Sequence, residues 1–349
     1  MRRPVFSSNP LITLVVLAFA AALPAPAKSA LPSTADSASP PVEVASAEFL
    51  PGAAPGSKGP QSFALASTVV PGYTIRHTVP EVRLQFSVAD ERGRLITDLC
   101  AADVRILDDD ETMARIRQFS RTDNLPLQVG LLLDVSDSVQ KSISHEKLAS
   151  QFFVGRVFRP QTDHAFLMAF GREVRLWQTS TGDRNVLRDA LDRVRQIGYV
   201  TSLYDSVYDA CLHQFPDSGR GELVQRIIVL FSDGEDTGSL HGLSDAISQA
   251  QRHEIQIYAL SMHPRQKYSP GDAVLRRMAE ETGGELYVVN SDKDLGAAFA
   301  GMESQMRTQY SVSFPPERTT PGFHELRIET TTKPHLVVHA RQGYYFDAP

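Results

Sequence analysis

Hydrophobic and polar positions along this chain follow two different periods. Between residues 126 and 308, short apolar runs alternate with segments in which apolar side chains recur every three or four positions. Short apolar runs bounded by polar residues are typical of strands buried on both faces of a parallel sheet, and the longer period is that of helices with one buried face. The pattern predicts an α/β fold for residues 126–308, with a doubly wound, mainly parallel, Rossmann-like sheet covered by helices on both faces.

The individual elements of this region follow from the same patterns and from helix stop signals. Strands are predicted at residues 127–134, 164–170, 173–178, 226–233, 255–262 and 285–289. Helices are predicted between Asp134 and Pro160, at residues 185–197, after Thr201, and at residues 242–252, 273–282 and 292–307. In the first helix, the side chains expected to face the core are Leu148, Phe152, Phe153 and Val157.

The segments on either side of this region change to a strand-like period. Residues 82–88 alternate apolar and polar side chains, which indicates a half-buried strand. Further strands are expected at residues 104–107, 114–119, 310–314, around 326–328 and at 336–340. Because one hairpin and a strand bury too little surface to be stable alone, we expect residues 74–122 and 309–346 to form one discontinuous β-sandwich-like domain. It should lie at the edge of the parallel sheet opposite the end of its first strand.

An acidic run, Asp-Asp-Asp-Glu at residues 108–111, joins two of these expected strands. A calcium loop would space its oxygen ligands at alternate positions around a central glycine and end on a glutamate. The run has none of these features, so we expect a solvated hairpin turn.

The first 73 residues have the composition of a targeting segment followed by a linker. Two arginines precede an apolar stretch at residues 11–23 and an Ala-Pro-Ala cleavage site, which predicts a signal peptide at residues 1–27. Residues 28–73 are rich in Pro, Ala, Ser and Gly and are expected to be a flexible linker. With no second hydrophobic span, the protein is predicted to be exported, to the periplasm or the exterior, with no membrane span after cleavage.

Composition narrows the class of partner. The net charge is −6, with no clustered basic face of the kind that binds nucleic acid. Cys100 and Cys211 fall in different predicted domains, so we expect two buried free thiols rather than a disulfide. Three of the scattered histidines, His213, His253 and His324, are expected to be surface or helix-cap residues.

Oxygen-bearing side chains cluster where two of the buried strands end. The first strand is followed by Asp134, Ser136 and Ser138, and a later strand ends in Asp233. Thr201 begins the helix between them. Ligands of open α/β sheets bind at the carboxyl ends of the strands, and a set made only of oxygen donors suits a hard cation. These residues therefore predict a metal site at that edge.

The same five positions resemble the metal-ion-dependent adhesion site of the von Willebrand factor type A (VWFA) domain. Residues 74–346 as a whole resemble the bacterial exported VWFA-related family of acidobacterial type, through Gly-Arg-Leu-Ile-Thr-Asp-Leu at 93–99, Ser-Asp-Gly-Glu-Asp-Thr at 232–237 and Arg-Gln-Gly-Tyr-Tyr at 341–345. The resemblance implies a divalent cation, Mg²⁺ before Mn²⁺ or Ca²⁺. It also implies adhesion or protein–protein interaction, in which a protein partner offers an Asp or Glu carboxylate to the cation. It does not specify the partner or the oligomeric state.

Two alternatives use the same residues. Asp134 also resembles the nucleophile of haloacid-dehalogenase-like phosphatases, but Ser136 stands where their second aspartate would act as acid and base. No phosphate-binding loop, Gly-x-Ser-x-Gly elbow or His-Glu-x-x-His helix is present, so we expect no enzymatic activity. The second alternative is a structural scaffold of an envelope assembly in which the metal only stabilises the loops. Asp137 and the pair Glu235–Asp236 either tune the charge of the site or are exposed loop acids.

Overall fold

The computed structural model describes residues 81–109, 112–136, 143–195, 198–216, 224–262, 270–331 and 335–346. The predicted signal peptide and linker lie outside these residues. Residues 74–349 form one compact unit, to which the following description applies.

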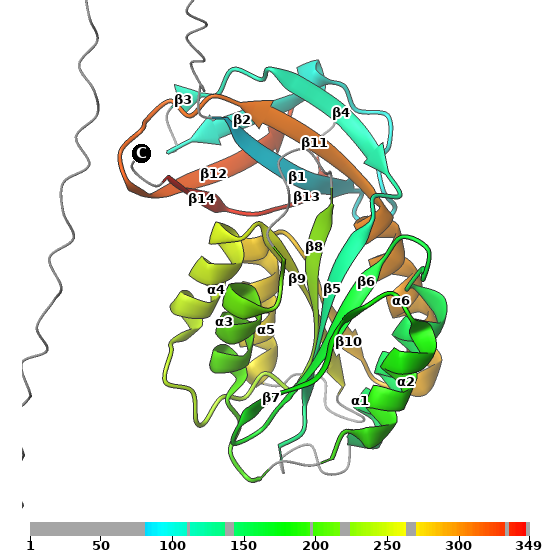
Figure 1. Ribbon diagram of the computed structural model, residues 1–349. Coiled ribbons are helices and arrows are strands. Elements are labelled where there is room, and N and C mark those ends of the chain that lie inside the picture. The colour runs from blue at the N-terminus through cyan, green and yellow to red at the C-terminus, as the bar shows by residue number, and fades with distance from the viewer. Residues whose placement is uncertain are drawn as a thin grey trace, which may run out of the picture. The chain divides into compact units, whose positions relative to one another are not determined.

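The centre of this unit is a six-stranded sheet with the strand order β10-β9-β8-β5-β6-β7 (Figure 1). Its strands are β5 (Leu127–Asp134), β6 (His164–Phe170), β7 (Val174–Thr181), β8 (Gln225–Phe231), β9 (Ile255–Met262) and β10 (Leu286–Val289). Every neighbouring pair is parallel except β6 and β7, which are antiparallel. The predicted doubly wound, mainly parallel sheet is therefore confirmed.

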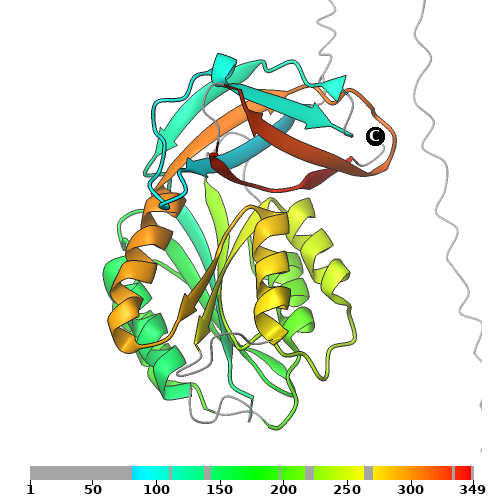
Figure 2. The same ribbon diagram turned by 180° about the vertical axis from the view of Figure 1, so that it is seen from behind.

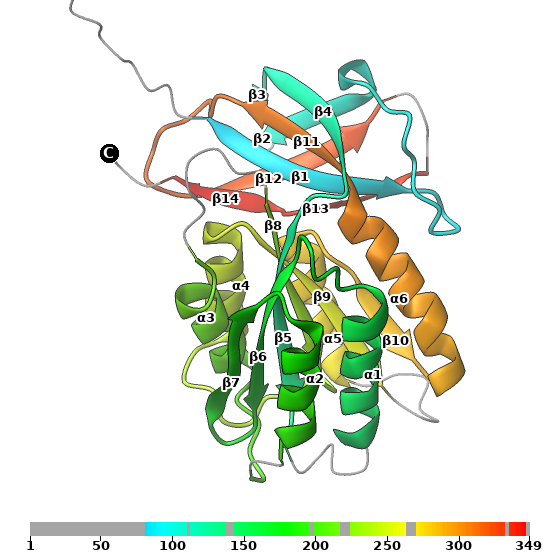
Figure 3. The same cartoon turned by 45° about the vertical axis from the view of Figure 1, so that its right-hand side comes forward.

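Helices cover both faces of the sheet (Figures 1 and 3). One face is covered by α1 (Ile143–Arg156), α2 (Arg184–Arg193) and α6 (Asp292–Arg307), and the other by α3 (Leu203–His213), α4 (Leu243–Arg252) and α5 (Pro270–Thr282). The buried side chains of β5 alternate between the two cores, with Leu131 and Leu133 in the first and Leu132 in the second. A strand with apolar residues on both faces is thus explained by two helical layers.

The first helix departs from its predicted orientation. Phe153 and Val157 are buried as expected, but Leu148 is 45% and Phe152 37% exposed. Phe152 stacks on Phe299 of α6 with ring centroids 5.5 Å apart. The apolar stripe of α1 is wide because it covers a neighbouring helix as well as the sheet, and the prediction for Leu148 and Phe152 was wrong.

Two further sheets, each of four strands, are formed by the segments that flank the α/β region. One has the order β13-β1-β11-β4 and the other β14-β12-β2-β3. The strands are β1 (Val82–Ala89), β2 (Val104–Asp108), β3 (Thr112–Met113), β4 (Gln118–Asp123), β11 (Thr308–Phe314), β12 (Gly322–Thr330), β13 (Val337–Ala340) and β14 (Gly343–Phe346), with a 3-10 turn at Ala101–Asp103. One apolar cluster contains side chains from both sheets, among them Phe86, Ile106 and Tyr310.

The predicted strand at residues 114–119 is divided between these two sheets. Ala114 donates its amide to Ile106 in β2, whereas Arg117 donates to Ser313 in β11. The chain crosses from one sheet to the other between these residues, so no single strand forms there. The last strand, β14, was not predicted.

Both sheets lie at the edge of the central sheet where β5 begins, and α6 leads directly into β11 (Figures 1 and 2). Arg307, the last residue of α6, donates to the Asp163 carboxylate and to the carbonyl groups of Leu125 and Val157. This ion pair is almost completely buried, with 5% of the Arg307 side chain and none of Asp163 exposed. The boundaries of the two predicted domains stay a prediction, because residues 74–349 cluster as one unit.

The two cysteines are both free but differ in environment. Cys211 is buried in α3, and burial raises the pKa of its thiol. Cys100 is exposed, which corrects the prediction of two buried thiols. Its position just before the 3-10 turn, where its backbone amide donates to Asp103, leaves the side chain at the surface.

Candidate functional site

The strand order reverses direction at β5. Its sequence neighbour β6 lies on one side and the later strand β8 on the other, so the carboxyl ends of β5 and β8 border the switch point of the sheet. Leu133 is paired with Phe231 in this register. Asp134 follows Leu133 and Ser232 follows Phe231, so these two residues lie side by side at the point where the connecting loops separate.

Asp134 is a fully buried carboxylate at this point. Its Oδ1 accepts hydrogen bonds from the amide of Ser136 at 3.0 Å and from the Ser136 hydroxyl at 2.7 Å. Its Oδ2 accepts a hydrogen bond from the Ser232 hydroxyl at 2.8 Å. Each of these donors is neutral, so the carboxylate is oriented but its charge is not neutralised.

Burial raises the pKa of Asp134 to about 6, although the hydrogen bonds from Ser136 and Ser232 oppose the shift. The negative charge of Asp233 raises it further, and Asp233 directly follows Ser232, whose hydroxyl is bonded to Asp134. Among the residues that the structure describes, no Lys, Arg or His side chain pairs with Asp134. Burial makes the charged form of this carboxylate costly, and a cation beside it would lower that cost.

The loop that carries Thr201 is held by its backbone. The amide of buried Thr201 donates to the Thr237 hydroxyl, and its carbonyl oxygen accepts the amides of Thr237 and Gly238, each at 3.0 Å. A Cβ atom on Gly238 would lie 2.1 Å from Cγ1 of Val200, so only glycine allows the two loops this approach. The loop before α3 and the loop after β8 therefore pack as neighbours.

Asp233 is fixed from its own loop and from the start of α5. Its Oδ1 accepts the amide of Glu235 at 3.0 Å. The next residue, Gly234, has φ of +81°, and a Cβ atom there would lie 2.2 Å from the carbonyl oxygen of Gly271. Close packing against α5 thus requires glycine after Asp233.

The structure brings four of the five predicted ligands to one edge of the sheet. Asp134 and Ser136 are in direct contact, Asp233 is near enough to affect the pKa of Asp134, and Thr201 is bonded to the loop that follows Asp233. The fifth, Ser138, lies outside the described residues, as does Asp137. Coordination of a metal ion by these residues stays a prediction.

Two acids beside the site have different roles. Asp236 is partly buried and its Oδ1 accepts the amides of Leu203 and Tyr204, at 2.8 and 3.3 Å, which caps the first turn of α3. Glu235 is exposed. Of the two options left open by the sequence, the exposed loop acid therefore describes Glu235 but not Asp236.

Ser232 and the pair Asp205–His241 were not recognised as part of this edge. Ser232 lies inside the Ser-Asp-Gly motif, but its contact with Asp134 joins residues 98 positions apart. His241 and Asp205 are bonded at 2.7 Å across 36 positions. The signals in the sequence for Ser232 were its place at the end of a buried strand and in the Ser-Asp-Gly-Glu-Asp-Thr motif.

A separate cluster of Asp108, Asp109 and His324 joins β2 to β12, and its ligand-type atoms lie within 4.8 Å of one another. Nε2 of His324 is 2.8 Å from the Thr320 carbonyl oxygen, and Nδ1 is 2.9 Å from Oδ2 of Asp109. A carbonyl and an ionised carboxylate only accept, so both contacts are hydrogen bonds only when the ring is protonated. The arrangement is that of a partly buried ion pair, with 3% of the His324 side chain and 24% of that of Asp109 exposed.

The pKa values agree with this assignment. Burial lowers the pKa of His324, but the bonds to Thr320 and Asp109 outweigh it and the net shift is upward. Burial likewise raises the pKa of Asp109, but the bonds from His324 and the Glu325 amide lower it on balance. The prediction of a solvated turn was wrong for Asp108, and that of a surface histidine was wrong for His324, because both are buried.

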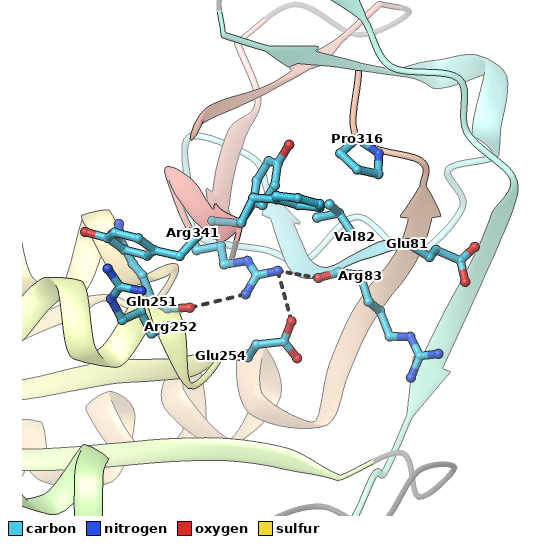
Figure 4. A pocket seen from close by; sticks show the side chains of 11 residues that line it. Glu81, Val82, Arg83, Gln251, Arg252, Glu254, Pro316 and Arg341 are labelled. Atoms are coloured by element: carbon cyan, nitrogen blue, oxygen red, sulfur yellow. Dashed lines mark hydrogen bonds and ion pairs between the residues drawn. The ribbon is translucent and has the colours of Figure 1, made fainter. Parts of the chain in front are cut away.

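A cavity of about 140 Å³ lies between α4 and the β sheets (Figure 4). Arg341 lines this cavity. The terminal nitrogens of Arg341 donate to the carbonyl groups of Arg83 and Gln251 and to Glu254. The guanidinium thus caps the carboxyl end of α4, a favourable place for a cation. These contacts join the β sheets to the α/β region.

The order of the parallel strands, with a buried carboxylate at their switch point, defines an open-sheet, Rossmann-like domain. Residues 128–300 match the model of the von Willebrand factor type A domain, and this segment of the chain is a domain of that family. Its assignment to an exported bacterial subgroup of acidobacterial type is not tested by this match and stays a prediction.

Solved structures with a similar fold come from several organisms. The conserved hypothetical protein BatB from Bacteroides thetaiotaomicron is 16% identical with a TM-score of 0.42, over 52% of this chain and 98% of that chain. A von Willebrand factor type A protein from Catenulispora acidiphila is 11% identical with a TM-score of 0.43, over 78% and 75%. Proximal thread matrix protein 1 from the mussel byssus is 16% identical with a TM-score of 0.45, over 57% and 50%. No curated protein matches the chain.

Every helix among the described residues is too short or too polar to cross a membrane.

Proposed function

We propose that this protein is an exported interaction module that binds a protein partner through a divalent cation held at the carboxyl ends of β5 and β8. Domains of this family usually mediate protein–protein interaction. The observation that carries the proposal is the Asp134 carboxylate, which is fully buried and has only neutral hydrogen-bond donors among the described residues. A cation from outside the chain would supply the missing charge.

The donors at this edge fit a hard divalent ion. Asp134, Ser136, Thr201 and Asp233 offer only oxygen, as does Ser138, and Mg²⁺ is the ion we expect, with Mn²⁺ or Ca²⁺ as substitutes. When bound, the cation would offer an open coordination position to an Asp or Glu carboxylate of the partner. The chain's own part is to hold the oxygens in place: Ser136 and Ser232 orient both oxygens of Asp134, and Gly234 sets Asp233 against α5.

Two apolar side chains at this edge support a protein as the partner. Leu240 is 93% and Tyr199 84% exposed, the highest values among the large hydrophobic residues that the structure describes. Leu240 follows Asp233 and Tyr199 precedes Thr201 by only a few positions in the two loops. A large aromatic and an aliphatic side chain beside a charged centre are typical of contacts that protein interfaces bury.

We infer that the module has no catalytic activity of its own. A hydrolase of the phosphatase type would need a second group beside Asp134 to move a proton, and the residue there is Ser136. The imidazole at this edge, His241, is bonded to Asp205 rather than to Asp134. Export is proposed from residues 1–27 alone, with a destination in the periplasm or outside the cell.

Calorimetric titration of Mg²⁺ and Mn²⁺ into the purified chain tests the metal site. We expect saturable binding that is lost in Asp134→Ala and in Ser136→Ala. Asp209→Ala is the matched control: it removes a carboxylate of α3 that is 44% exposed, and it should bind as the parent does. A folded parent that binds neither ion would overturn the proposal.

A second experiment separates the interaction module from a scaffold with a stabilising metal. With saturating Mg²⁺, a short peptide with one central Asp is titrated into the chain, and the same peptide with Asn serves as the control. Binding of the Asp peptide that disappears with chelator supports the interaction module. Metal binding that raises stability with no difference between the peptides supports the scaffold.

A further inference from the structure

The two loops that carry Thr201 and Asp233 are joined at more than one point. We call them the 199–205 loop, which includes the first three residues of α3, and the 233–241 loop. Near the site, the backbone of Thr201 is bonded to Thr237 and Gly238. At the start of α3, Asp236 caps Leu203 and Tyr204, and the Ser239 hydroxyl accepts the amide of Asp205 at 3.1 Å. Contacts at these points restrict sliding of one loop past the other.

Asp205 closes the far end of this connection. Its Oδ2 accepts the amide of Leu240 at 2.9 Å, and its Oδ1 accepts the amide of His241 at 2.9 Å and the His241 ring nitrogen Nδ1 at 2.7 Å. The His241 ring is stacked on Tyr208, one turn further along α3, with centroids 3.8 Å apart and planes 12° apart. One carboxylate therefore holds both the backbone and a side chain of the other loop.

The chemistry of Asp205 fits this task. Burial raises the pKa of its carboxyl group, but the bonds from Leu240 and His241 outweigh burial and lower the pKa on balance. The group is therefore ionised at neutral pH, and its bonds are of the strong, charge-assisted kind. Asp205 is four residues after Thr201. The amides that it binds belong to Leu240 and His241, the last two residues of the loop that begins at Asp233.

We propose that Asp205 and His241 are positioning residues, which fix the 233–241 loop on the 199–205 loop and so hold Thr201 and Asp233 at the distance that a bound cation requires. This inference rests on the proposed function. Removing a residue that orients metal ligands without contacting the metal typically weakens metal affinity by about 10- to 100-fold. Without the Asp205–His241 contact, binding a cation would first have to order the loop.

Two substitutions at His241 separate hydrogen bonding from ring packing. In His241→Asn, the side-chain amide takes the place of Nδ1 and can still donate to Asp205, but the ring on Tyr208 is lost. In His241→Phe, the ring remains and the donor is lost. Asp205→Ala removes the acceptor, and Asp209→Ala on the same helix is the control.

Metal affinity is measured by Mg²⁺ and Mn²⁺ calorimetry, and the stability of each variant by urea unfolding in chelator. We expect Asp205→Ala and His241→Phe to bind about 10- to 100-fold more weakly, with His241→Asn and Asp209→Ala within about threefold of the parent. Variants that lose stability but bind the ions as the parent does would overturn the inference and leave the proposed function intact.

Amide hydrogen exchange in chelator tests the connection without a metal. The amides of Leu240 and His241 should be protected in the parent, and their exchange should be faster by about tenfold or more in Asp205→Ala, while core amides of β5 are unchanged. Exchange of these two amides at the rate of a free loop in the parent would overturn the inference whether or not a metal binds. A parent that binds no metal but shows the protection would overturn the proposed function, and with it the role in metal binding.

Discussion

Two aspartates with no exposed surface lie at opposite ends of the central sheet. Asp134 ends β5, and Asp163 immediately precedes β6 at the edge where β5 begins. Asp163 is paired with the guanidinium of Arg307 and also accepts the amides of Leu127 and Arg159. Among the described residues, Asp134 accepts hydrogen bonds only from the neutral groups of Ser136 and Ser232.

The difference shows how one residue type serves two purposes. A buried carboxylate needs compensation for lost hydration, and at Asp163 the chain supplies it permanently through Arg307. That arrangement fixes the end of α6 where it leads into β11. At Asp134 the described residues supply orientation without charge, so under the proposed function the compensation would come from a proton or from a cation that enters from solvent. This lack of a counter-charge among the described residues is the difference that the following predictions test.

The largest effect is expected from removing Arg307, the cationic side chain that pairs with Asp163. Arg307→Met leaves Asp163 charged and buried, and breaking a buried pair in this way costs about 3–5 kcal/mol of unfolding free energy. Urea unfolding at pH 7 measures the loss. The neighbouring Arg159, whose pair with Glu303 at 3.2 Å is partly exposed, is the control. Arg159→Ala should cost less than about 1 kcal/mol from that pair, and equal losses in both variants would contradict the comparison.

At the other end of the sheet, neutralising the Asp134 carboxylate should raise the free energy of unfolding rather than lower it. In chelator at pH 7, Asp134→Asn should be more stable than the parent. Each pKa unit corresponds to about 1.4 kcal/mol, so the rise to about 6 corresponds to at most about 3 kcal/mol. Asp163→Asn, which removes a charge that Arg307 needs, should instead be destabilised. Urea unfolding of both variants gives the two signs.

The stability gain in Asp134→Asn depends on pH because the pKa of Asp134 is raised. A carboxyl group whose pKa is higher in the folded state than in the unfolded state stabilises the fold at low pH, and this contribution is lost as pH rises through the folded value. The advantage of Asp134→Asn should therefore grow as pH rises from about 4 to about 6 and stay constant above. An advantage that shrinks over this range would mean that Asp134 has a cationic partner.

Local patterns in the sequence are sufficient to place most of the fold and part of the site. The apolar runs that become β5 and β8 predict Asp134 and Asp233 at one edge, because a strand buried on both faces must be apolar until it ends. The bounds of β6, β9 and α6 were predicted without error. These elements depend on periodicity, which the sequence carries directly.

Contacts between distant residues were not predictable in the same way. The bond from Ser232 to Asp134, and that from His241 to Asp205, depend on which strands and loops become neighbours in space. His324 was assigned to the surface because its partner Asp109 is 215 positions away. The exposed side of α1, with Leu148, likewise depends on how many neighbours a helix has rather than on its own period.

Adding a metal should stabilise only the Asp134 end. With Mg²⁺ at about 100 times its dissociation constant, the parent should gain about 2.7 kcal/mol. Asp134→Asn should gain nothing. Arg307→Met should gain the same as the parent, because β5 has 8 residues and its ends are therefore roughly 20 Å apart, and effects at distant sites add. Thermal or urea unfolding with Mg²⁺ and with chelator measures these gains, and a smaller gain in Arg307→Met would show that the two ends are coupled.

The smallest effect concerns Asp109, which pairs with His324, a cation only at some pH values, and more weakly with the exposed Arg318 at 3.8 Å. His324 has a raised pKa, so its stabilising charge is complete below the ordinary value of 6.5 and is lost as pH rises through the raised value. Asp109 has a lowered pKa, so its own contribution is lost only in acid. His324→Phe keeps a ring beside Tyr344 and should cost about 1–2 kcal/mol near pH 5.5, and less at pH 8. His335→Phe, which affects an exposed pair with Glu91, is the control in the same urea series and should show no such trend. If the cost of His324→Phe does not change with pH, the ring does not change its charge between pH 5.5 and pH 8, and the pH-dependent pair with Asp109 is ruled out.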